Sequence, residues 1–563
     1  MLLWPGRVRR AEAQGGLPAA LLGALLGLAP LSSVPGQERR PPIDEARLDA
    51  LKVEVAGQVD ARADLVQRVV DQIFSFGELG FQEVETSRYL VGLLRREGFA
   101  VDTGVAGMPT AWVARWGRGR PVIALGSDID AIPQASQVPG VACRMPLVEG
   151  APGHGEGHNS GQAVNLAAAL AVKRIMERER LAGTLVLWPG VAEELVAGKP
   201  FLVRAGVFRD VDVVLFSHVG TEFATSWGPT SGSGLVSVLY RFGGTAAHAA
   251  GQPWQGRSAL DAAELMDIGW NFRREHLPLK QRSHSVIVDG GDQPNVVPQS
   301  ASVWYYLREL DYKGIKALWA VADSVAAGAA LMTGTTLLPT RVLGAAWPRH
   351  YNRPVAEALA ANIRRVGMPA WTGEDQAFAR AVQRAVGQPD SGLKRRVDSL
   401  SPPLEPSRNM GGPSDDIGDV SWTVPTVVLY YPANVGGLPG HHWSSAMAMA
   451  TPIAHKGSVA GAKAGAMTLL DLLLRPALVD SARSYFTDVQ TRRTRYEPLI
   501  RPDDQPPLDL NRAILERHRP AMRAYYYDAR RYRTYLEQLG VSYPVLPDSG
   551  GACRVRLKPP RPR

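Results

Sequence analysis

The sequence has little cysteine, little histidine and few long apolar runs. Its 563 residues include only two cysteines, Cys143 and Cys553, so the fold cannot depend on a framework of several disulfides. Beyond the N-terminal region we expect no segment of ~20 apolar residues, which excludes an integral membrane span in the mature chain. The composition, 45% hydrophobic and 21% charged, is typical of a soluble globular protein with more than one domain.

The formal net charge of +9 is concentrated towards the C-terminus. From Arg475 onward the chain has 18 Lys and Arg residues against 10 Asp and Glu residues, and the rest is close to neutral. Arginine-rich runs such as TRRTR and DARRYRTY are typical of a solvated surface. The charge distribution therefore predicts no nucleic-acid partner.

The first residues have the layout of a secretory signal. A basic start is followed by an apolar run of Leu and Ala, then by small residues and a Pro-Gly break. We expect a signal peptide over residues 1–36, and a mature protein that is exported to the periplasm or secreted. An uncleaved membrane anchor is the alternative, although the apolar run is short for a span.

Apolar strands and long helical patterns alternate in the first half of the chain. Short runs rich in apolar and β-branched residues lie at 121–128, 184–190 and 212–218, and a helical pattern at 161–180 separates the first two. Runs that are apolar throughout are typical of parallel strands covered on both faces. The predicted fold class is α/β, with a mostly parallel sheet and helices on both of its faces.

A second unit interrupts this pattern. Between residues 235 and 345 the predicted elements follow the order β-α-β-β-α-β, which is the ferredoxin-like arrangement. A strand at 426–431 and a helix at 455–474 then resume the first pattern, and a Tyr-rich stretch at 511–539 has helical spacing. The predicted parts are a signal peptide, 1–36; a catalytic domain, 37–234 and 346–475; an inserted lid domain, 235–345; and a basic C-terminal extension, 476–563.

Polar residues lie at the ends of the three predicted strands. They are Asp128 and Asp130, Glu193 and Glu194, and His218. In an open parallel sheet, ligands bind in the crevice outside the carboxyl ends of the strands, where these residues would converge. A Glu-Glu pair alone is more typical of a solvated surface. Five such groups at one sheet edge indicate a site.

The stretch PGHGEGHNSG, residues 152–161, lies between the first two strands and would bring Glu156 and His158 into the same crevice. Imidazole mixed with carboxylate suits Zn²⁺ or another borderline divalent ion. We predict two divalent metal ions per chain, with zinc first and manganese or cobalt as alternatives. Two rival motifs fail, because no Gly-Lys-Ser/Thr follows for a phosphate loop and HGEGH lacks the HExxH spacing of a zinc helix.

Together these motifs resemble the co-catalytic zinc peptidase and amidohydrolase family, which includes aminoacylases, glutamate carboxypeptidases and hippurate hydrolase. The resemblance is strongest to aminobenzoyl-glutamate utilisation protein B. It rests on GSDIDAIP, GHGEGHN, PGVAEEL, SDDIGDVSWTVPT and PGHHWSS, and it spans about residues 60–475. It implies a two-metal catalytic domain and a lid through which the protein forms a homodimer.

The resemblance also implies a role for each site residue. Glu193 would be the general base, and Asp130 would orient a metal ligand. His248 of the lid would stabilise the oxyanion in the site of the partner chain, while Arg257 and Asn295 would contact the substrate carboxylate or carbonyl. For Arg257 a structural ion pair is the alternative. The implied metal ligands are Glu156, His158, Glu194, His218 and His441, with the adjoining His442 as the alternative to His441.

The sequence departs from the family at Glu156, where the nearest branch has a cysteine ligand. A glutamate can bind metal through oxygen, and loss of one metal is the alternative. The predicted function is hydrolysis of the amide bond of an N-acyl amino acid or small peptide-like substrate by a metal-activated water. A catalytically silent relative that binds metal or ligand without turnover is the alternative, and the intact Glu193-Glu194 pair favours the enzyme.

Overall fold

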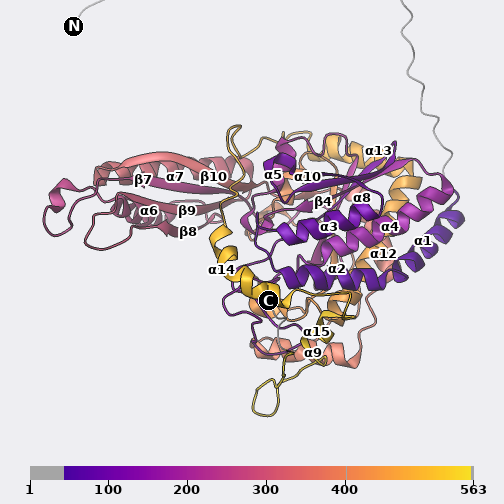
Figure 1. Ribbon diagram of the computed structural model, residues 1–563. Coiled ribbons are helices and arrows are strands. Elements are labelled where there is room, and N and C mark those ends of the chain that lie inside the picture. Colours follow the sequence, from indigo (N-terminus) through magenta and orange to yellow (C-terminus); the bar gives the residue numbers. More distant parts are fainter. Residues whose placement is uncertain (1–42, 401, 559–563) are drawn as a thin grey trace, which may run out of the picture. The chain divides into compact units, whose positions relative to one another are not determined.

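The computed structural model describes residues 43–400 and 402–558 (Figure 1). Its larger sheet has six strands in the order β1-β2-β4-β3-β5-β12. The last four strands in this order run parallel, and β1 and β2 are antiparallel additions at one edge. The predicted mostly parallel sheet is therefore confirmed. Its strands are β1 (Ala100–Thr103), β2 (Trp112–Arg118), β3 (Val122–Asp128), β4 (Gly183–Gly190), β5 (Val213–Gly220) and β12 (Thr426–Pro432).

Side chains on both faces of this sheet are buried, which explains its apolar strands. Leu215 lies on the side of α4 and α12, close to Gly465, whereas the next residue, Phe216, packs with Trp188 on the other face. Every residue of β3 is buried. The helices of this region are α1 (Glu45–Asp60), α2 (Ala63–Phe76), α3 (Val84–Arg96), α4 (Gly161–Glu179), α5 (Lys199–Arg204), α8 (Arg353–Val366), α9 (Gly373–Ala385), α10 (Ile417–Ser421), α11 (Trp443–Ala446) and α12 (Pro452–Leu474).

The inserted unit is a four-stranded antiparallel sheet in the order β10-β7-β9-β8, with α6 and α7 packed against it (Figure 1). This is the β-α-β-β-α-β arrangement expected from the sequence. β8 forms one edge of the sheet. The elements are β7 (Gly234–Gly243), α6 (Ala259–Arg274), β8 (Arg282–Asp289), β9 (Ser300–Glu309), α7 (Tyr312–Thr333) and β10 (Thr336–Ala346). A separate two-stranded sheet pairs β6 (Gly228–Pro229), which precedes β7 in the sequence, with β11 (His350–Tyr351), which follows β10.

The C-terminal extension contains α13 (Pro476–Tyr485), α14 (Arg512–Met522) and α15 (Tyr535–Leu539). The expected continuous helix over 511–539 is wrong, because the residues between α14 and α15 are not α-helical and Pro520 lies in the last turns of α14. The predicted signal peptide lies outside the described residues.

Two helices are long and apolar enough to cross a membrane by length and composition, α7 and α12. Two such helices are weak evidence for a membrane span, because the core helix of a soluble protein passes the same test. The apolar window of α12 is 83% buried inside the protein and that of α7 is 39% buried. The composition of α12 is explained by its place in the core of the catalytic domain, since a core helix has the same apolar character as a span.

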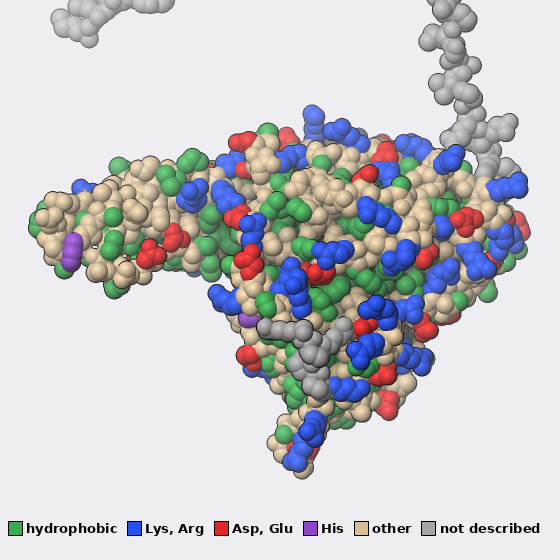
Figure 2. All heavy atoms as spheres, viewed as in Figure 1, with side chains coloured by type: hydrophobic (Ala, Val, Ile, Leu, Met, Phe, Trp, Pro, Cys, Tyr) green, Lys and Arg blue, Asp and Glu red, His purple; other side chains and the backbone are tan. Residues whose placement is uncertain are grey.

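Figure 2 shows how basic side chains are distributed on one face of the molecule. On the face drawn in Figure 2, Lys and Arg side chains are interspersed with Asp and Glu and form no single large patch. On that face the arrangement is that of an ordinary solvated surface, as expected from the sequence.

Candidate metal centre

The loop that precedes α4 is shaped by its glycines. A Cβ on Gly155 would lie 2.5 Å from the Cδ1 atom of Ile132, and Gly157 has a φ of +123°, which L-residues rarely adopt. The backbone can therefore turn sharply here and direct both Glu156 and His158 to the end of the sheet. His154 points elsewhere, since its Nε2 atom lies 3.1 Å from the carbonyl oxygen of Ile73.

The Glu193-Glu194 pair is held on a short turn after β4. Ala192 and Val196, which flank this turn, have φ values of 53° and 54°. A β-branched residue such as Val196 is strained in this region of backbone space, and such strain persists only where surrounding contacts enforce it. The Ala192 amide donates a hydrogen bond of 2.8 Å to the buried carboxylate of Glu83. This hydrogen bond holds the backbone of the turn in place.

Three histidines and three glutamates come together at this point. His218 Nε2 lies 3.6 Å from one oxygen of Glu156, and His441 Nε2 lies 3.2 Å from the other. His441 Nε2 is also 3.1 Å from Glu194. His158 Nε2 lies 3.9 Å from Glu156 and 4.0 Å from Glu193.

The donor atoms of this cluster fit divalent metal ions. Glu156, His158, Glu193 and Glu194 each offer one ligand atom within 4.8 Å of the others. Both ring nitrogens of His158 and one oxygen of Glu194 are buried without a hydrogen-bond partner. Unpartnered buried polar atoms are rare in folded proteins unless an ion or water satisfies them. The set of imidazole and carboxylate donors is one that Zn²⁺, Mn²⁺ or Co²⁺ accepts.

Charges inside the cluster oppose one another. Burial raises the pKa of Glu156, but a hydrogen bond with His441 and the neighbouring His158 and His218 outweigh it and hold the pKa below its ordinary value. Burial raises the pKa of Glu194 well above its ordinary value, and the carboxylate of Glu156 raises it further. A bound cation would relieve this crowding of carboxylates.

Two of the imidazoles have a neighbour that orients them. His218 Nδ1 lies 2.8 Å from the Val219 carbonyl oxygen, and Asp130 Oδ1 lies 3.4 Å from His158 Nδ1. The other oxygen of Asp130 accepts a hydrogen bond from the Glu194 amide. Such contacts fix which ring nitrogen is free to bind a metal. The adjoining His442 instead accepts from the Ser444 amide at the start of α11, so His441 is the histidine that faces the cluster.

A second group of acidic side chains, beside Glu193, is paired with a lysine. The ammonium group of the fully buried Lys199 lies 2.6 Å from Asp128 and 3.6 Å from Asp415, and it pairs with Asp416. Burial raises the pKa of Glu193 well above its ordinary value, and Asp415 and Asp128 raise it further while Lys199 lowers it. The lysine thus takes the position that a metal would otherwise need to fill among these carboxylates.

Curated relatives match most of the chain. One of the proteins that make up the p-aminobenzoyl-glutamate hydrolase of Escherichia coli (strain K12) is 33% identical, covering 77% of this chain and 94% of the relative. The Xaa-Arg dipeptidase of Mus musculus is 30% identical, covering 78% of this chain and 93% of the relative. No protein-family model matches the chain.

The chain belongs to the amidohydrolase and peptidase family that includes this hydrolase and this dipeptidase. A solved structure described as an aminohydrolase from methicillin-resistant Staphylococcus aureus agrees on the fold, with a TM-score of 0.52 and 18% identity. That match covers 75% of this chain and 100% of the solved one. The family resemblance inferred from the motifs is confirmed, and so is the α/β fold class.

In this amidohydrolase-family chain the three predicted lid residues form hydrogen bonds with other residues of the inserted unit. His248 Nδ1 accepts from the Ala250 and Gly251 amides, and the backbone oxygen of Asn295 accepts from the Ala249 amide. Arg257 donates to the Trp254 and Gly256 carbonyls, and no ion pair is found for it among the described residues. Within the described part of the chain, no hydrogen bond or ion pair joins these three residues to the metal cluster.

Other residues near the cluster were not predicted from the sequence. Arg308 and Tyr306, two residues apart on β9, are electrostatic neighbours of Glu193. Burial lowers the pKa of Arg308, and Tyr306 and Glu193 oppose that shift. Arg349 lies 3.9 Å from Asp415. Tyr306 and Arg308 could have been predicted from the sequence SVWYYLREL, because large residues with polar ends alternate there and so share one face of a strand.

Proposed function

We propose that the chain hydrolyses the amide bond of an N-acyl amino acid or a small peptide-like substrate of the aminobenzoyl-glutamate type. The observation that carries the proposal is the Glu193-Glu194 turn facing His158, whose ring nitrogens are buried and unpartnered. The names of the relatives support the substrate class. They include a p-aminobenzoyl-glutamate hydrolase, an Xaa-Arg dipeptidase and an indole-3-acetyl-aspartic acid hydrolase.

The proposed cofactors are two divalent ions, zinc first. The ligands would be Glu156, His158, Glu194, His218 and His441. The two oxygens of Glu156 lie near different histidines, His218 and His441, so both would be available as ligand atoms. When bound, such ions polarise a carbonyl group and lower the pKa of water towards ~7.

The residues of this chain would then perform the proton transfers. Glu193, which is not needed as a ligand, would take a proton from the attacking water and return it to the amine nitrogen as the amide bond breaks. Asp130 would hold the ring of His158 in place from behind. His248 of the partner subunit would donate to the carbonyl oxygen as it gains negative charge, which is the step that oxyanion stabilisation accelerates most.

The surroundings of the cluster suit an acyl amino acid. Glu156 and His441 adjoin a cavity of about 310 Å³ whose other lining residues include Val435, Leu438 and Pro439. These apolar residues would contact the substrate group on one side of the amide bond. Arg257 and Asn295 would contact the substrate carboxylate or carbonyl, and Arg308 is a further cation on the lid side of Glu193.

We further propose a homodimer that forms through the lid. The edge strand β8 has exposed apolar side chains at Val286, Ile287 and Val288, with 59%, 47% and 55% of their surface accessible. An exposed edge strand of this kind favours pairing with another chain. Because two of the relatives are named as different components of one Escherichia coli hydrolase, a hetero-oligomer is the competing outcome. The molecular mass of the assembly in solution distinguishes the homodimer from the hetero-oligomer.

Export is the proposed localisation. The pairing of Cys143 with Cys553 supports it, because disulfides persist in oxidising compartments. N-terminal sequencing of the mature protein tests the predicted signal peptide.

The decisive test of the function is a substrate panel. Metal-loaded protein is incubated with N-acyl amino acids, including p-aminobenzoyl-glutamate, and with dipeptides, and release of the free amine is measured. Glu193→Gln is the matched control. Wild-type turnover that the Glu193→Gln variant lacks supports the proposal. Metal binding without turnover of any substrate would favour the catalytically silent alternative.

A further inference from the structure

The C-terminal extension, residues 476–563, follows the last of the sequence motifs that resemble the family. The match to the Escherichia coli relative covers 94% of that protein but 77% of this chain, so this chain has sequence that the relative does not match. The extension is nevertheless built into the catalytic domain over its described length.

The extension first contacts the base of the lid. The guanidinium of Arg501 donates a hydrogen bond of 2.7 Å to the Thr340 carbonyl, and Arg341 forms an ion pair of 3.0 Å with Asp509. Arg204 of α5, the helix that follows the Glu193-Glu194 turn, donates to the Asp504 carbonyl. The start of the extension therefore joins the lid to the helix behind the candidate site.

The extension then covers the segment 77–84, which connects α2 to α3. The Gln82 side chain donates to the carbonyls of Leu508 and Leu510, both at 3.1 Å. The Asn511 side chain donates to the Gly80 carbonyl at 3.2 Å. The next helix, α14, supplies Arg519, whose guanidinium donates to the Gln82 carbonyl at 2.9 Å.

The same segment lies directly behind the metal centre on its other side. The Glu78 carbonyl accepts from the Ala131 amide at 2.8 Å, next to Asp130. A Cβ on Gly80 would lie 2.8 Å from the Cα atom of Ala192 and 3.2 Å from an oxygen of Asp130. A shift of this segment would therefore displace the residues that precede and orient Glu193 and Glu194.

One ion pair connects the extension to this segment. The carboxylate of Glu78 is fully buried, and it accepts from the Thr86 amide at 2.9 Å and from Arg519 at 3.0 Å. Burial raises the pKa of Glu78 to about 7, and the amides and Arg519 oppose that shift. Removing one partner of a buried ion pair leaves an uncompensated charge, which is strongly unfavourable.

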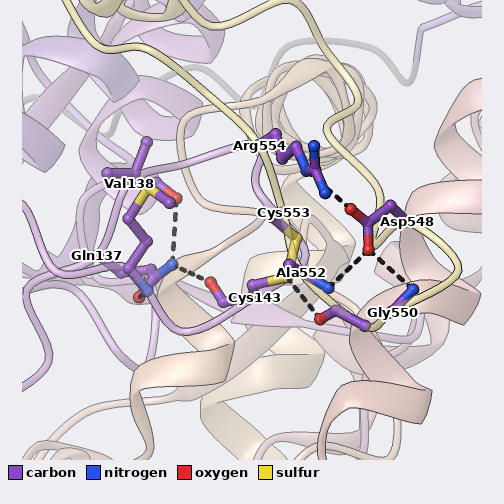
Figure 3. The surroundings of a disulfide bond; sticks show 10 residues. Gln137, Val138, Cys143, Asp548, Gly550, Ala552, Cys553 and Arg554 are labelled. Carbon is purple, nitrogen blue, oxygen red and sulfur yellow. Dashed lines mark hydrogen bonds and ion pairs between the residues drawn. A yellow bond between two sulfur atoms is a disulfide. The ribbon is translucent and has the colours of Figure 1, made fainter.

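The far end of the extension is fastened covalently. Val545 pairs with the backbone of Val141, and Cys553 forms a disulfide with Cys143 across a sequence separation of 410 residues. Figure 3 shows this bond beside Gln137, whose side chain donates to the Cys143 carbonyl. The loop from 131 to 153 thus runs from Asp130, past the disulfide, into the metal-binding stretch.

We infer that the C-terminal extension is a brace for the metal centre, and that Arg519 is its positioning residue. It acts through Glu78 on the segment 77–84, and so on Asp130 and on the Glu193-Glu194 turn. The inference rests on the proposed function, because it assumes that these groups hold metal ions.

The test is zinc binding to the full-length protein by calorimetry, which needs no substrate. We expect Arg519→Met to weaken zinc binding about tenfold, at the low end of the roughly 10–100-fold effect of residues that orient metal ligands. Arg519→Lys keeps the charge and should restore part of the affinity. Arg517→Met is the matched control, since Arg517 is exposed on the same helix and should bind zinc like the wild type.

A second variant covers the case in which Arg519→Met fails to fold. Asn511→Gly removes the side-chain hydrogen bond to Gly80 and tolerates the φ of +64° at this position, because glycine adopts such values without strain. It should increase hydrogen exchange over residues 77–84 and 190–195 while weakening zinc binding. Wild-type zinc affinity in folded Arg519→Met or in Asn511→Gly, even with a lower unfolding temperature, would overturn the brace and leave a structural role only.

A third variant separates this inference from the proposed function. Glu194→Ala removes a proposed ligand and should abolish binding of at least one zinc ion. If it does so and the extension variants bind zinc normally, the brace alone is wrong. If Glu194→Ala binds zinc like the wild type, the metal centre itself is wrong, and the brace falls with it.

Discussion

At the scale of single residues, the proposed reaction depends on Glu193 as the group that would accept the proton from water. Its carboxylate lies on a strained turn, and burial, together with Asp415 and Asp128, raises its pKa well above the ordinary value. A raised pKa suits a group that must accept a proton and then release it near neutral pH.

We expect Glu193→Gln to keep the metal ions and lose turnover, because an amide cannot accept the proton from water. General-base catalysis contributes typically ~10²–10⁴-fold, so the loss in kcat should fall in this range. The measurement is kcat together with metal content by elemental analysis. A Gln variant with the wild-type rate would remove Glu193 from this role.

The second prediction at this scale concerns Glu156, at the position where the motif resemblance implies a cysteine in the nearest branch of the family. If it connects two ions, Glu156→Ala should lower the metal content from two ions per chain towards one, and Glu156→Cys should keep binding while favouring softer ions such as Zn²⁺. Elemental analysis of both variants after dialysis against mixed Zn²⁺ and Mn²⁺ measures this. Unchanged metal content in Glu156→Ala would show that the carboxylate is a bystander.

Some site residues could be predicted from the sequence and others could not, for a physical reason. Glu156 and His158 stand in a glycine-rich motif, and the Glu pair follows an apolar strand, so local pattern reveals them. Lys199 has no such pattern, because its partners Asp128 and Asp416 lie 71 and 217 residues away along the chain. An isolated lysine or arginine becomes recognisable only when the fold supplies its partner.

At the scale of elements, the parallel strands of the larger sheet were predictable, whereas β1 and β2 at one of its edges were not. β3 and β5 are covered on both faces and are therefore apolar until their last residues, where Asp128 and His218 lie. β1 and β2 lie at one edge of the sheet, and the exposed and charged end of β2 hides its strand character. The break between α14 and α15 was missed because helical spacing continues across residues that the tail uses to contact the catalytic domain.

The lid provides the prediction that belongs to this scale. His248 and the cluster are not in contact within one described chain, so a dimer is needed if His248 acts on the reaction. We expect that mixing inactive His248→Ala chains with inactive Glu193→Gln chains restores activity, because one hybrid site then receives both intact groups. With random exchange about half of the dimers are hybrids.

The control for this experiment is a mixture of differently tagged Glu193→Gln chains, which must form dimers and remain inactive. Isolation of dimers that carry both tags verifies exchange. Verified hybrids without activity would place His248 outside the partner's site.

At the scale of the whole molecule, the C-terminal extension connects segments that are distant from one another in the sequence. It contacts the lid base, the α2–α3 connection and the loop that leads to Glu156. The extension is recognisable in the sequence as basic and Tyr-rich, but its path is not. Its contacts are mostly side chain to backbone carbonyl, and such contacts leave no pattern in the sequence of either partner.

The disulfide gives the last prediction. A single disulfide contributes typically about 2–4 kcal/mol, mainly by restricting the unfolded chain. Because Cys553 lies near the end of the described chain, its release should first free the residues after Val545 and unfold nothing else. We expect the double variant Cys143→Ser, Cys553→Ser to retain zinc and activity, to unfold a few degrees lower, and to be cleaved by trypsin between residues 546 and 558. Mass spectrometry of the fragments locates the cleavage. The wild type under reducing conditions should give the same fragments, and cleavage that instead begins between residues 77 and 84 would show that the disulfide stabilises the whole brace rather than its end.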